Sequence, residues 1–351
     1  MNGGQGLNSY ANNSTYQRGG FEAVKPIMEE EIATKLDLKN RSSKTPFRIA
    51  DFGCSTGLNS FPAMQTIIQA IEKKIDTQKG LLSGPPDFQV FFVDQLVNDF
   101  ASLFRLLPPE RNYYSAAVPG SFQDRLLPNA SIDFAYSSCA LNWFSKIPAA
   151  VEDRSSPAWN GGRVHYTGAR REVFEAYAKH FANDIRLFLE ARAREVVAGG
   201  LMALLVPAVP TFEIPDNSFA TPTELDLVGS CLVDMAKKGK IKKEKIDSFN
   251  FPMYLTIPQE FQTILERNPK FSIERFEIID SPGKSTLAGA NARAGFMRAI
   301  LEVLLINHFG GEIIDELFDR YTKKLASSPV FIDPNNDKSI LILVILKRKP
   351  E

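Results

Sequence analysis

Residues 47–60 read FRIADFGCSTGLNS. The apolar start of this stretch predicts a buried strand over 47–53, which ends at an acidic residue and a glycine. A helix is predicted over 59–74, because apolar residues recur there at helical spacing. Gly53 and Gly57 allow a ligand to approach the backbone of the turn closely. An ordinary strand-to-helix turn explains the glycines equally well, since short glycine-rich matches are weak evidence.

Outward from this stretch, apolar strands alternate with helical patterns. Further strands are predicted over 87–94, 132–138, 201–209, 271–279 and 340–347. Helices are predicted over 21–38, 59–74, 99–107, 173–197, 224–238, 259–267, 291–308 and 313–325. Gly199 and Gly200 are interpreted as the C-cap of the helix before them. The alternation indicates an α/β fold with a parallel, doubly wound sheet and a mostly helical cap.

The same pattern divides the chain into four segments. Residues 21–210 are predicted to form the α/β core and residues 211–330 a helical cap that carries the substrate pocket. Residues 331–351 are predicted to return to the core sheet as its closing strand. Residues 1–20 are rich in Gly, Asn and Ser, and this composition by itself predicts a disordered tail.

Composition excludes several classes of protein. The 351 residues contain 41 Lys and Arg against 41 Asp and Glu, so the formal net charge is zero and a nucleic-acid partner is not expected. Three cysteines without a CxxC pair argue against a disulfide framework or a zinc site. No apolar run approaches the roughly 20 residues that span a bilayer. We expect a cytoplasmic protein that acts on a small molecule without a membrane.

Acidic and aromatic residues near the predicted strand ends suggest a nucleoside ligand. A carboxylate at Asp94, where the second strand ends, suits the two ribose hydroxyls. The spacing from Gly53 is too long for a dinucleotide motif, which favours a nucleoside without pyrophosphate, most commonly S-adenosylmethionine (SAM). Ser121 and Phe122 could hold an adenine, although a turn serine beside a core aromatic is equally plausible. Trp143 offers a fixed N–H donor, but a lone tryptophan is more often a core residue.

Seven segments together resemble the SABATH methyltransferases of plants. They are MNGGQGLNSYANNSTYQ, RIADFGCSTGLNS, FFVDQLVNDF, VPGSFQDRLLP, LNWFSKIP, DSFNFPMY and MRAILEVLL. They occur in the order expected of the family, and the resemblance covers nearly the whole chain. Enzymes of that family transfer methyl from SAM to small carboxylic acids or to ring nitrogens of xanthines. FRIADFGCSTG, GRVHYTG and LEARAREVVAGGLM look closest to a subgroup that includes loganic-acid methyltransferases. The resemblance also implies a homodimer.

The resemblance implies a role for residues of each motif in binding SAM. Residues 1–20 would fold over the site as a lid. The SAM-binding residues would be Tyr10, Ser14, Asp51, Gly53, Ser55, Asn59, Asp94, Gln95, Ser121, Phe122, Ser137 and Cys139. Among them, Asp51 and its neighbours would surround the methionine end, Asp94 and Gln95 the ribose, and Ser121 and Phe122 the adenine. Ser137 and Cys139 would lie beside the reacting methyl group.

The resemblance also implies where the acceptor would bind. Gln17 and Trp143 would share its carboxylate as the catalytic residues. The substrate-binding residues would be Gln17, Cys139, Asn142, Trp143, Leu225, Tyr254 and Met297. Some relatives bind Mg²⁺ through residues that match Asn160, Asp247, Phe249 and Asn250, and these oxygen donors suit a hard cation, although a plain loop is the simpler interpretation.

Two acidic residues of the pocket region leave an alternative open. If Glu224 or Asp226 faced the pocket, an acceptor with an amine would be favoured. A solvated start of the helix over 224–238 is the simpler interpretation.

Four positions depart from the family pattern. Val93 replaces an asparagine that often precedes the ribose-binding acid, and Leu58 replaces a proline. Cys139 stands where an aromatic residue is common, and Asn142 where His, Gln or Met is common. None of the four removes a group that methyl transfer requires. Together they suggest a reshaped acceptor pocket.

The predicted reaction is the SAM-dependent methylation of a small iridoid, aromatic or alkaloid-type acid to its methyl ester. A carboxylate is ionised at pH 7, because its usual pKa is about 4, so it needs no general base. In-line positioning and exclusion of water are then the tasks of the protein. The alternatives are N-methylation of a xanthine-like heterocycle and a SAM-binding homologue that has lost methyl transfer.

Overall fold

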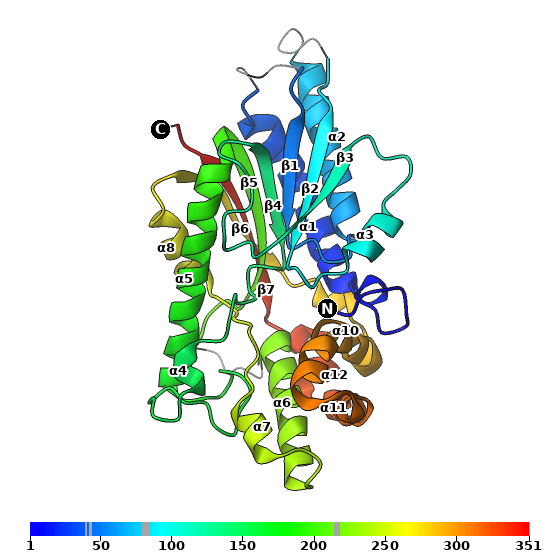
Figure 1. Ribbon diagram of the computed structural model, residues 1–351, viewed down its shortest axis with the longest axis vertical. Helices are drawn as coiled ribbons and strands as arrows, with labels where there is room; N and C mark the ends of the chain where they lie inside the picture. Colours follow the sequence, from blue (N-terminus) through cyan, green and yellow to red (C-terminus); the bar gives the residue numbers. More distant parts are fainter. Residues whose placement is uncertain (39–40, 42–43, 79–83, 214–217, 351) are drawn as a thin grey trace.

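A seven-stranded sheet in the order β3-β2-β1-β4-β5-β7-β6 forms the centre of the molecule (Figure 1). The computed structural model describes residues 1–38, 41, 44–78, 84–213 and 218–350. Its strands are β1 (Phe47–Phe52), β2 (Phe88–Asp94), β3 (Tyr114–Pro119), β4 (Ile132–Ser138), β5 (Val196–Ala208), β6 (Phe271–Asp280) and β7 (Ile340–Arg348). The predicted α/β class, a doubly wound sheet with a mostly helical cap, is confirmed.

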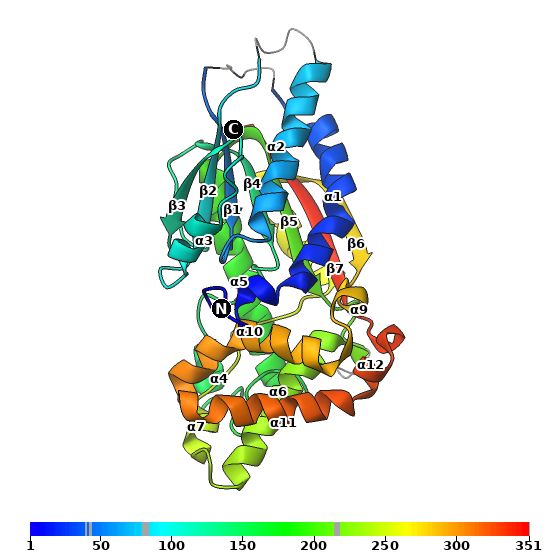
Figure 2. The same ribbon diagram turned by 90° about the vertical axis from the view of Figure 1, so that its right-hand side faces the viewer.

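The sheet is mixed rather than wholly parallel. Strands β1 to β5 pair in parallel, whereas β7 lies between β5 and β6 and is antiparallel to both. The chain leaves β6 at the edge of the sheet where the cap lies and passes through the cap helices before it reaches β7 (Figure 2). Strand β7 therefore begins at the edge where β6 ends and must run back in the opposite direction.

Helices cover both faces of the sheet. Helices α1 (Thr15–Lys35) and α2 (Ser60–Thr77) lie side by side on one face (Figure 2). Helices α5 (Arg171–Glu195) and α8 (Pro258–Glu266) pack on the other. Because side chains alternate along a strand, Ile49 of β1 belongs to the first apolar core and Ala50 and Phe52 to the second.

The cap lies beyond the carboxyl ends of the parallel strands (Figure 2). Its helices are α6 (Ala220–Lys237), α7 (Lys243–Asp247), α10 (Gly289–Phe309), α11 (Ile314–Ala326) and α12 (Pro329–Ile332). The remaining short helices are η1 (Tyr10–Asn12), α3 (Phe100–Leu106), α4 (Ala149–Glu152), α9 (Gly283–Thr286), η3 (Gly311–Ile313) and η4 (Pro334–Asn336). Apolar side chains of α6, α10 and α11 join the core beneath α1 and α2, so cap and sheet share one apolar interior.

Two local expectations from the sequence are wrong, and one strand was missed. Strand β3 was not predicted, because its half-buried sequence YSAAVP lacks the run of large apolar residues expected of a buried strand. Gly199 and Gly200 do not cap α5, which ends at Glu195; both lie inside β5. The composition of residues 1–20 predicted disorder, yet η1 and the start of α1 are formed there and Tyr10 and Tyr16 are buried.

Among the described residues, none of the helices combines the length and the apolar composition that crossing a bilayer requires. The four-segment division of the chain stays a prediction; β6 of the central sheet falls within residues 211–330.

Candidate functional site

The carboxyl ends of the parallel strands β1 to β5 lie at the edge of the sheet that faces the cap (Figure 2). The Gly53 N–H donates to Val93 O (2.8 Å) and the Gly120 N–H to Asp94 O (2.8 Å), which joins the ends of β1, β2 and β3. Ser137 Oγ of β4 donates to Phe52 O (2.8 Å). These bonds bring together residues that lie far apart in the sequence.

The turn after β1 requires glycine. Gly53 has a φ of 95°, and a Cβ there would collide with the Cβ of Ala140. Ser55 adopts a φ of 49°, and its N–H donates to Asp94 Oδ2 (2.7 Å). The turn is thereby tied to the acid at the end of β2, as the ligand-binding interpretation of the glycines expects.

Asp94 is held by two backbone donors. Its carboxylate accepts from the N–H of Ser55 and, at 2.8 Å, from that of Gln95. Burial raises the pKa of this carboxyl, although both hydrogen bonds oppose the shift. Phe122 is buried beside the turn at Gly53, and Ser121 Oγ donates to Gln123 Oε1 (2.6 Å). The predicted ribose and adenine residues therefore border the same turn.

Asp51 is a buried acid whose charged neighbour is another acid, Asp94. Burial raises its pKa to about 7, although a hydrogen bond with Ser60 favours the ionised form. Its Oδ2 is buried and has no hydrogen-bond partner among the described residues. The hydroxyl oxygens of Ser14 and Thr56 are also buried, and neither has a hydrogen-bond partner among the described residues. Because such groups are costly to leave unpaired, they fit a polar ligand such as the amino-acid end of SAM.

The N-terminal segment spans the junction between core and cap. The Asn2 N–H donates to Ala299 O of α10 (2.8 Å), and the Gly4 N–H to Asp99 Oδ2 (2.9 Å) before α3. The side chain of Met1 lies against Ser55, with 3.6 Å between its sulfur and the Ser55 hydroxyl. Residues 1–14 thus pass over the glycine turn, where the predicted lid would lie.

Further along this segment, Tyr10 and Asn59 connect it to α2. A hydrogen bond with the Asn59 side chain opposes the rise in the pKa of Tyr10 that burial causes. The Asn59 amide also donates to Ser14 O (3.3 Å). Three predicted SAM-binding residues are therefore in contact.

Two buried amides border the predicted acceptor site. Gln17 on α1 and Asn142 after β4 are both buried, and their side-chain oxygens have no hydrogen-bond partner among the described residues. Cys139 lies between β4 and Asn142 with a φ of 54°. Burial raises the pKa of its thiol to about 12, so this group is neutral and does not act as a base at pH 7.

Trp143 and Met253 pair through their backbones, although they lie 110 residues apart in the sequence. A β-bridge joins the two residues, and the side chain of Met253 lies in the same apolar core as Cys139, Leu225 and Met297. Sequence reasoning missed Met253, because only its pairing with Trp143 shows which way its segment faces.

Tyr254 is separated from the other predicted pocket residues. Its side chain belongs to the second core, where its ring lies 5.1 Å from that of Phe181 and its hydroxyl 3.2 Å from Glu260. This is the alternation expected of extended backbone, since Met253 faces the first core. A substrate contact by Tyr254 stays a prediction.

Glu224 is buried, so the interpretation of a solvated helix start is wrong. Its Oε1 lies 3.2 Å from Nη1 of Arg293 on α10, and both side chains are nearly inaccessible. Burial raises the pKa of Glu224 to about 7, against the influence of Arg293. The arginine already offsets this carboxylate, so the structure gives no reason to favour an acceptor with an amine.

Three residues of the predicted metal site, Asn160, Asp247 and Asn250, already take part in hydrogen bonds within the protein. The Asn160 amide donates to Asn250 Oδ1 (2.8 Å), and the Gly162 N–H donates to Asp247 Oδ1 (2.8 Å). Within the described ranges, no three His, Cys, Asp or Glu side chains form a group that could hold a metal. One carboxylate and engaged amides are a poor fit for Mg²⁺.

Comparisons with known proteins agree with this geometry. A family model described as "SAM dependent carboxyl methyltransferase" matches residues 1–349. The chain is 42% identical to loganic acid O-methyltransferase of Catharanthus roseus over 99% of its own length and 94% of the relative. It is 40% identical to paraxanthine methyltransferase 2 of Arabidopsis thaliana over 91% of this chain and 90% of the relative.

A solved structure of loganic acid methyltransferase with SAH superimposes with a TM-score of 0.95. The two are 41% identical in sequence, and the match covers 100% of this chain and 99% of the other. The family match over nearly all of the chain, together with an edge of the sheet that fits SAM, establishes that this protein belongs to the SABATH family of SAM-dependent carboxyl methyltransferases.

Proposed function

We propose that the protein converts a small plant carboxylic acid of the iridoid, aromatic or alkaloid type to its methyl ester. Similarity to loganic acid O-methyltransferase over nearly the whole chain favours an iridoid acid as the first candidate. The departures at Val93, Cys139 and Asn142 leave room for a different acid.

The choice of a carboxylate as the acceptor rests on His165. This buried histidine is not free to act as a base. Both ring nitrogens of His165 are engaged, by Thr167 Oγ1 (2.6 Å) and by Met253 O (3.0 Å). Burial lowers its pKa to about 4, so it is neutral at pH 7. A carboxylate needs no base, whereas a ring N–H must lose a proton in the course of methylation.

Bound SAM supplies a methyl group on a positively charged sulfur. The acceptor carboxylate would form the new O–C bond as the C–S bond breaks, and SAH would leave with the electron pair. Gln17 and Trp143 would hold the carboxylate in line with the methyl group, and the N-terminal segment would exclude water. Asp51, Asp94, Phe122 and their neighbours would fix the other end of SAM.

The deciding experiment is transfer of labelled methyl from SAM across a panel of acids and xanthines. Iridoid, benzoic, indole and amine-bearing acids should be compared at equal concentration, and each product treated with mild base. Label on an acid that is lost in base supports the proposal. Base-stable label on a xanthine would replace it with the N-methyltransferase alternative, which the similarity to paraxanthine methyltransferase 2 keeps open.

SAH binding is expected to depend on pH through Asp51. Its pKa of about 7 means that the free protein carries a neutral carboxyl below pH 7. The ammonium of SAH favours the ionised form, so binding below pH 7 must release that proton. The Kd should therefore rise about tenfold for each unit below pH 7 and stay level above it. Titration calorimetry in two buffers of different ionisation enthalpy measures both effects. A slope that Asp51→Asn leaves unchanged would contradict the assignment.

Metal removal is expected to leave activity within about twofold of the untreated enzyme, because Asn250 Oδ1 and Asp247 Oδ1 already accept hydrogen bonds from the Asn160 amide and the Gly162 N–H. The check is kcat after EDTA treatment, with and without added Mg²⁺. A magnesium-dependent recovery of activity would restore the metal site that the family resemblance implies.

Two predictions complete the proposal: a homodimer, which the resemblance implies, and a cytoplasmic location, which the composition of the sequence suggests. The edge strand β3 exposes Tyr114, which is 66% accessible. Light scattering coupled to size-exclusion chromatography would measure the mass of the particle.

A further inference from the structure

The segment 120–131 that carries Ser121 and Phe122 has no helix or strand of its own. It connects β3 at the edge of the sheet with β4 at its centre. Irregular segments of this kind take their position from contacts with neighbouring elements. What holds this one decides where Ser121 and Phe122 lie.

One buried arginine on α5 holds the first half of the segment. The side chain of Arg192 is 0% exposed. Its Nη1 donates to Phe122 O (2.6 Å) and its Nη2 to Asp124 O (2.9 Å), while its Nε donates to Glu195 Oε2 (2.7 Å). Three of its donor atoms are therefore engaged, and two of them bond to this segment.

Glu195, one turn further along α5, holds the second half. Its Oε1 accepts from the N–H groups of Leu126 (2.6 Å) and Leu127 (2.9 Å). The carboxyl end of the segment is tied to the same turn, because the Ala130 N–H donates to Arg194 O (2.8 Å) and the Ser131 N–H to Glu195 O (2.8 Å). The final turn of α5 thus holds the segment from Phe122 to Ser131.

Aromatic packing fixes Arg192 and Phe122 relative to the glycine turn. The guanidinium carbon of Arg192 lies 4.1 Å from the ring centre of Phe52 at the end of β1. The ring of Phe122 packs edge-on against Phe188 of α5 at 6.2 Å. An arginine fork held in this way is a more rigid support than a flexible lysine would be.

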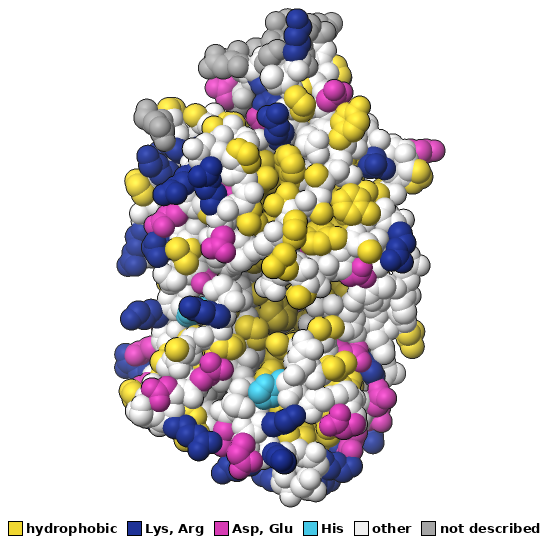
Figure 3. Space-filling model, viewed as in Figure 1, with side chains coloured by type: hydrophobic (Ala, Val, Ile, Leu, Met, Phe, Trp, Pro, Cys, Tyr) yellow, Lys and Arg dark blue, Asp and Glu magenta, His cyan; other side chains and the backbone are white. Residues whose placement is uncertain are grey.

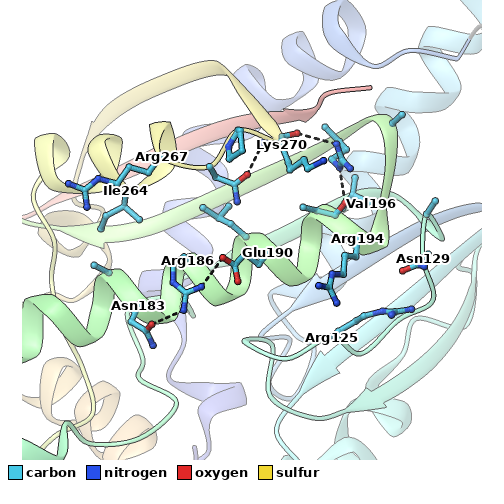
Figure 4. A pocket seen from close by; sticks show the side chains of 18 residues that line it. Arg125, Asn129, Asn183, Arg186, Glu190, Arg194, Val196, Ile264, Arg267 and Lys270 are labelled. Carbon is cyan, nitrogen blue, oxygen red and sulfur yellow. Dashed lines mark hydrogen bonds and ion pairs between the residues drawn. The ribbon is translucent and has the colours of Figure 1, made fainter. Parts of the chain in front are cut away.

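The outer side of the segment borders a groove. Arg125 and Asn129 line this groove, which has a volume of about 1130 Å³ and lies between the segment, α5 and the residues that follow α8 (Figure 4). Lysine and arginine side chains gather along the left of the same face of the molecule (Figure 3). The Arg192–Glu195 pair supplies side-chain hydrogen bonds from α5 that hold the backbone of residues 122–127 on the inner side.

We propose that Arg192 and Glu195 are positioning residues for the adenine of SAM, which act through the backbone of residues 122–127. This inference rests on the proposed adenine contacts of Ser121 and Phe122. A buried ion pair contributes little net stability, whereas breaking it leaves a buried charge unpaired. The function of the pair is to present Phe122 beside Gly53.

The test compares two ligands with two conservative variants. 5′-Methylthioadenosine carries the adenine and ribose of SAH without the amino acid. Arg192→Lys and Glu195→Gln should each raise the Kd of both ligands about tenfold in titration calorimetry. At saturating SAM, kcat and the KM of the acceptor should stay within about twofold. Arg194→Lys is the matched control, because Arg194 is an exposed neighbour on the groove, and its Kd values should equal those of the unchanged protein.

A purely structural pair would lower the melting temperature and leave both Kd values unchanged, and that result would overturn the inference. Glu195→Gln keeps the length of the side chain and an oxygen for the loop N–H groups, so it carries the test if Arg192→Lys does not fold. Phe122→Leu distinguishes a failure of the adenine assignment from a failure of the positioning inference. If it leaves the Kd of methylthioadenosine unchanged, the adenine assignment fails. If it weakens binding while the Arg192 and Glu195 variants do not, only the positioning inference fails.

Discussion

Trp143→Phe is expected to lower kcat about 30-fold while the Kd of SAH stays within about twofold. Phenylalanine keeps an aromatic ring against the apolar core but removes the indole N–H, which we propose holds the acceptor carboxylate with Gln17. A hydrogen bond to a charged group contributes about 1.5–3 kcal/mol, and its loss in the transition state accounts for the fall in rate. Steady-state kinetics with the acid found in the label-transfer panel, and calorimetry with SAH, provide the two measurements.

The chain provides a matched control for this variant. Trp159, the other tryptophan of the chain, packs beneath Arg154, 5.7 Å from the guanidinium carbon to its ring centre. Its buried Nε1 has no hydrogen-bond partner among the described residues. Trp159→Phe should leave kcat within about twofold, since no acceptor contact is lost. Equal losses of turnover and SAH affinity in Trp143→Phe would contradict a role in holding the carboxylate.

Asp94→Asn is expected to raise the Kd of SAH about 100-fold and to leave kcat at saturating SAM within about threefold. The ionised carboxylate accepts the N–H groups of Ser55 and Gln95 and would accept two ribose hydroxyls as well. An amide lacks the charge and turns its NH₂ group towards one of these donors. The ribose therefore loses charge-assisted hydrogen bonds, whereas the reacting carboxylate lies elsewhere.

The control lies at the other end of the same strand. Asp87 is exposed just before β2, so Asp87→Asn makes the same chemical change away from the proposed ribose site. Its Kd for SAH should match that of the unchanged protein. A Kd for Asp94→Asn within about twofold of that value would remove the ribose assignment.

Elements defined by local patterns were predictable from the sequence. The strand and helix around the glycine turn were expected over 47–53 and 59–74 and are β1, Phe47–Phe52, and α2, Ser60–Thr77. Apolar spacing decides both, because each element buries one face or one stripe of its own sequence. Strand β3 was not predicted from its sequence, because an edge strand needs no continuous apolar run.

Charged residues in the buried interior could not be interpreted from the sequence. Arg192 and Glu195 stand in the run ARARE, which reads as the solvated end of a helix, and Glu224 reads as a solvated helix start. Each is buried with an opposite charge, and the partner of Glu224 is 69 residues away. Arg293 of α10 pairs with Glu224, and segment 120–131 covers the Arg192–Glu195 pair of α5. Burial of these charges depends on contacts with distant parts of the chain, so a local sequence pattern cannot show it.

The sequence by itself determined the α/β class, the family, the SAM cofactor and the motifs that meet at the carboxyl edge of the sheet, because these follow from short patterns and from resemblance along the whole chain. Only the tertiary structure decided which side chains face one another there. The bridge between Trp143 and Met253 turns Met253 towards Leu225 and Met297 and turns Tyr254 away. Backbone pairing between distant segments sets this orientation, and a shift of one residue would reverse it.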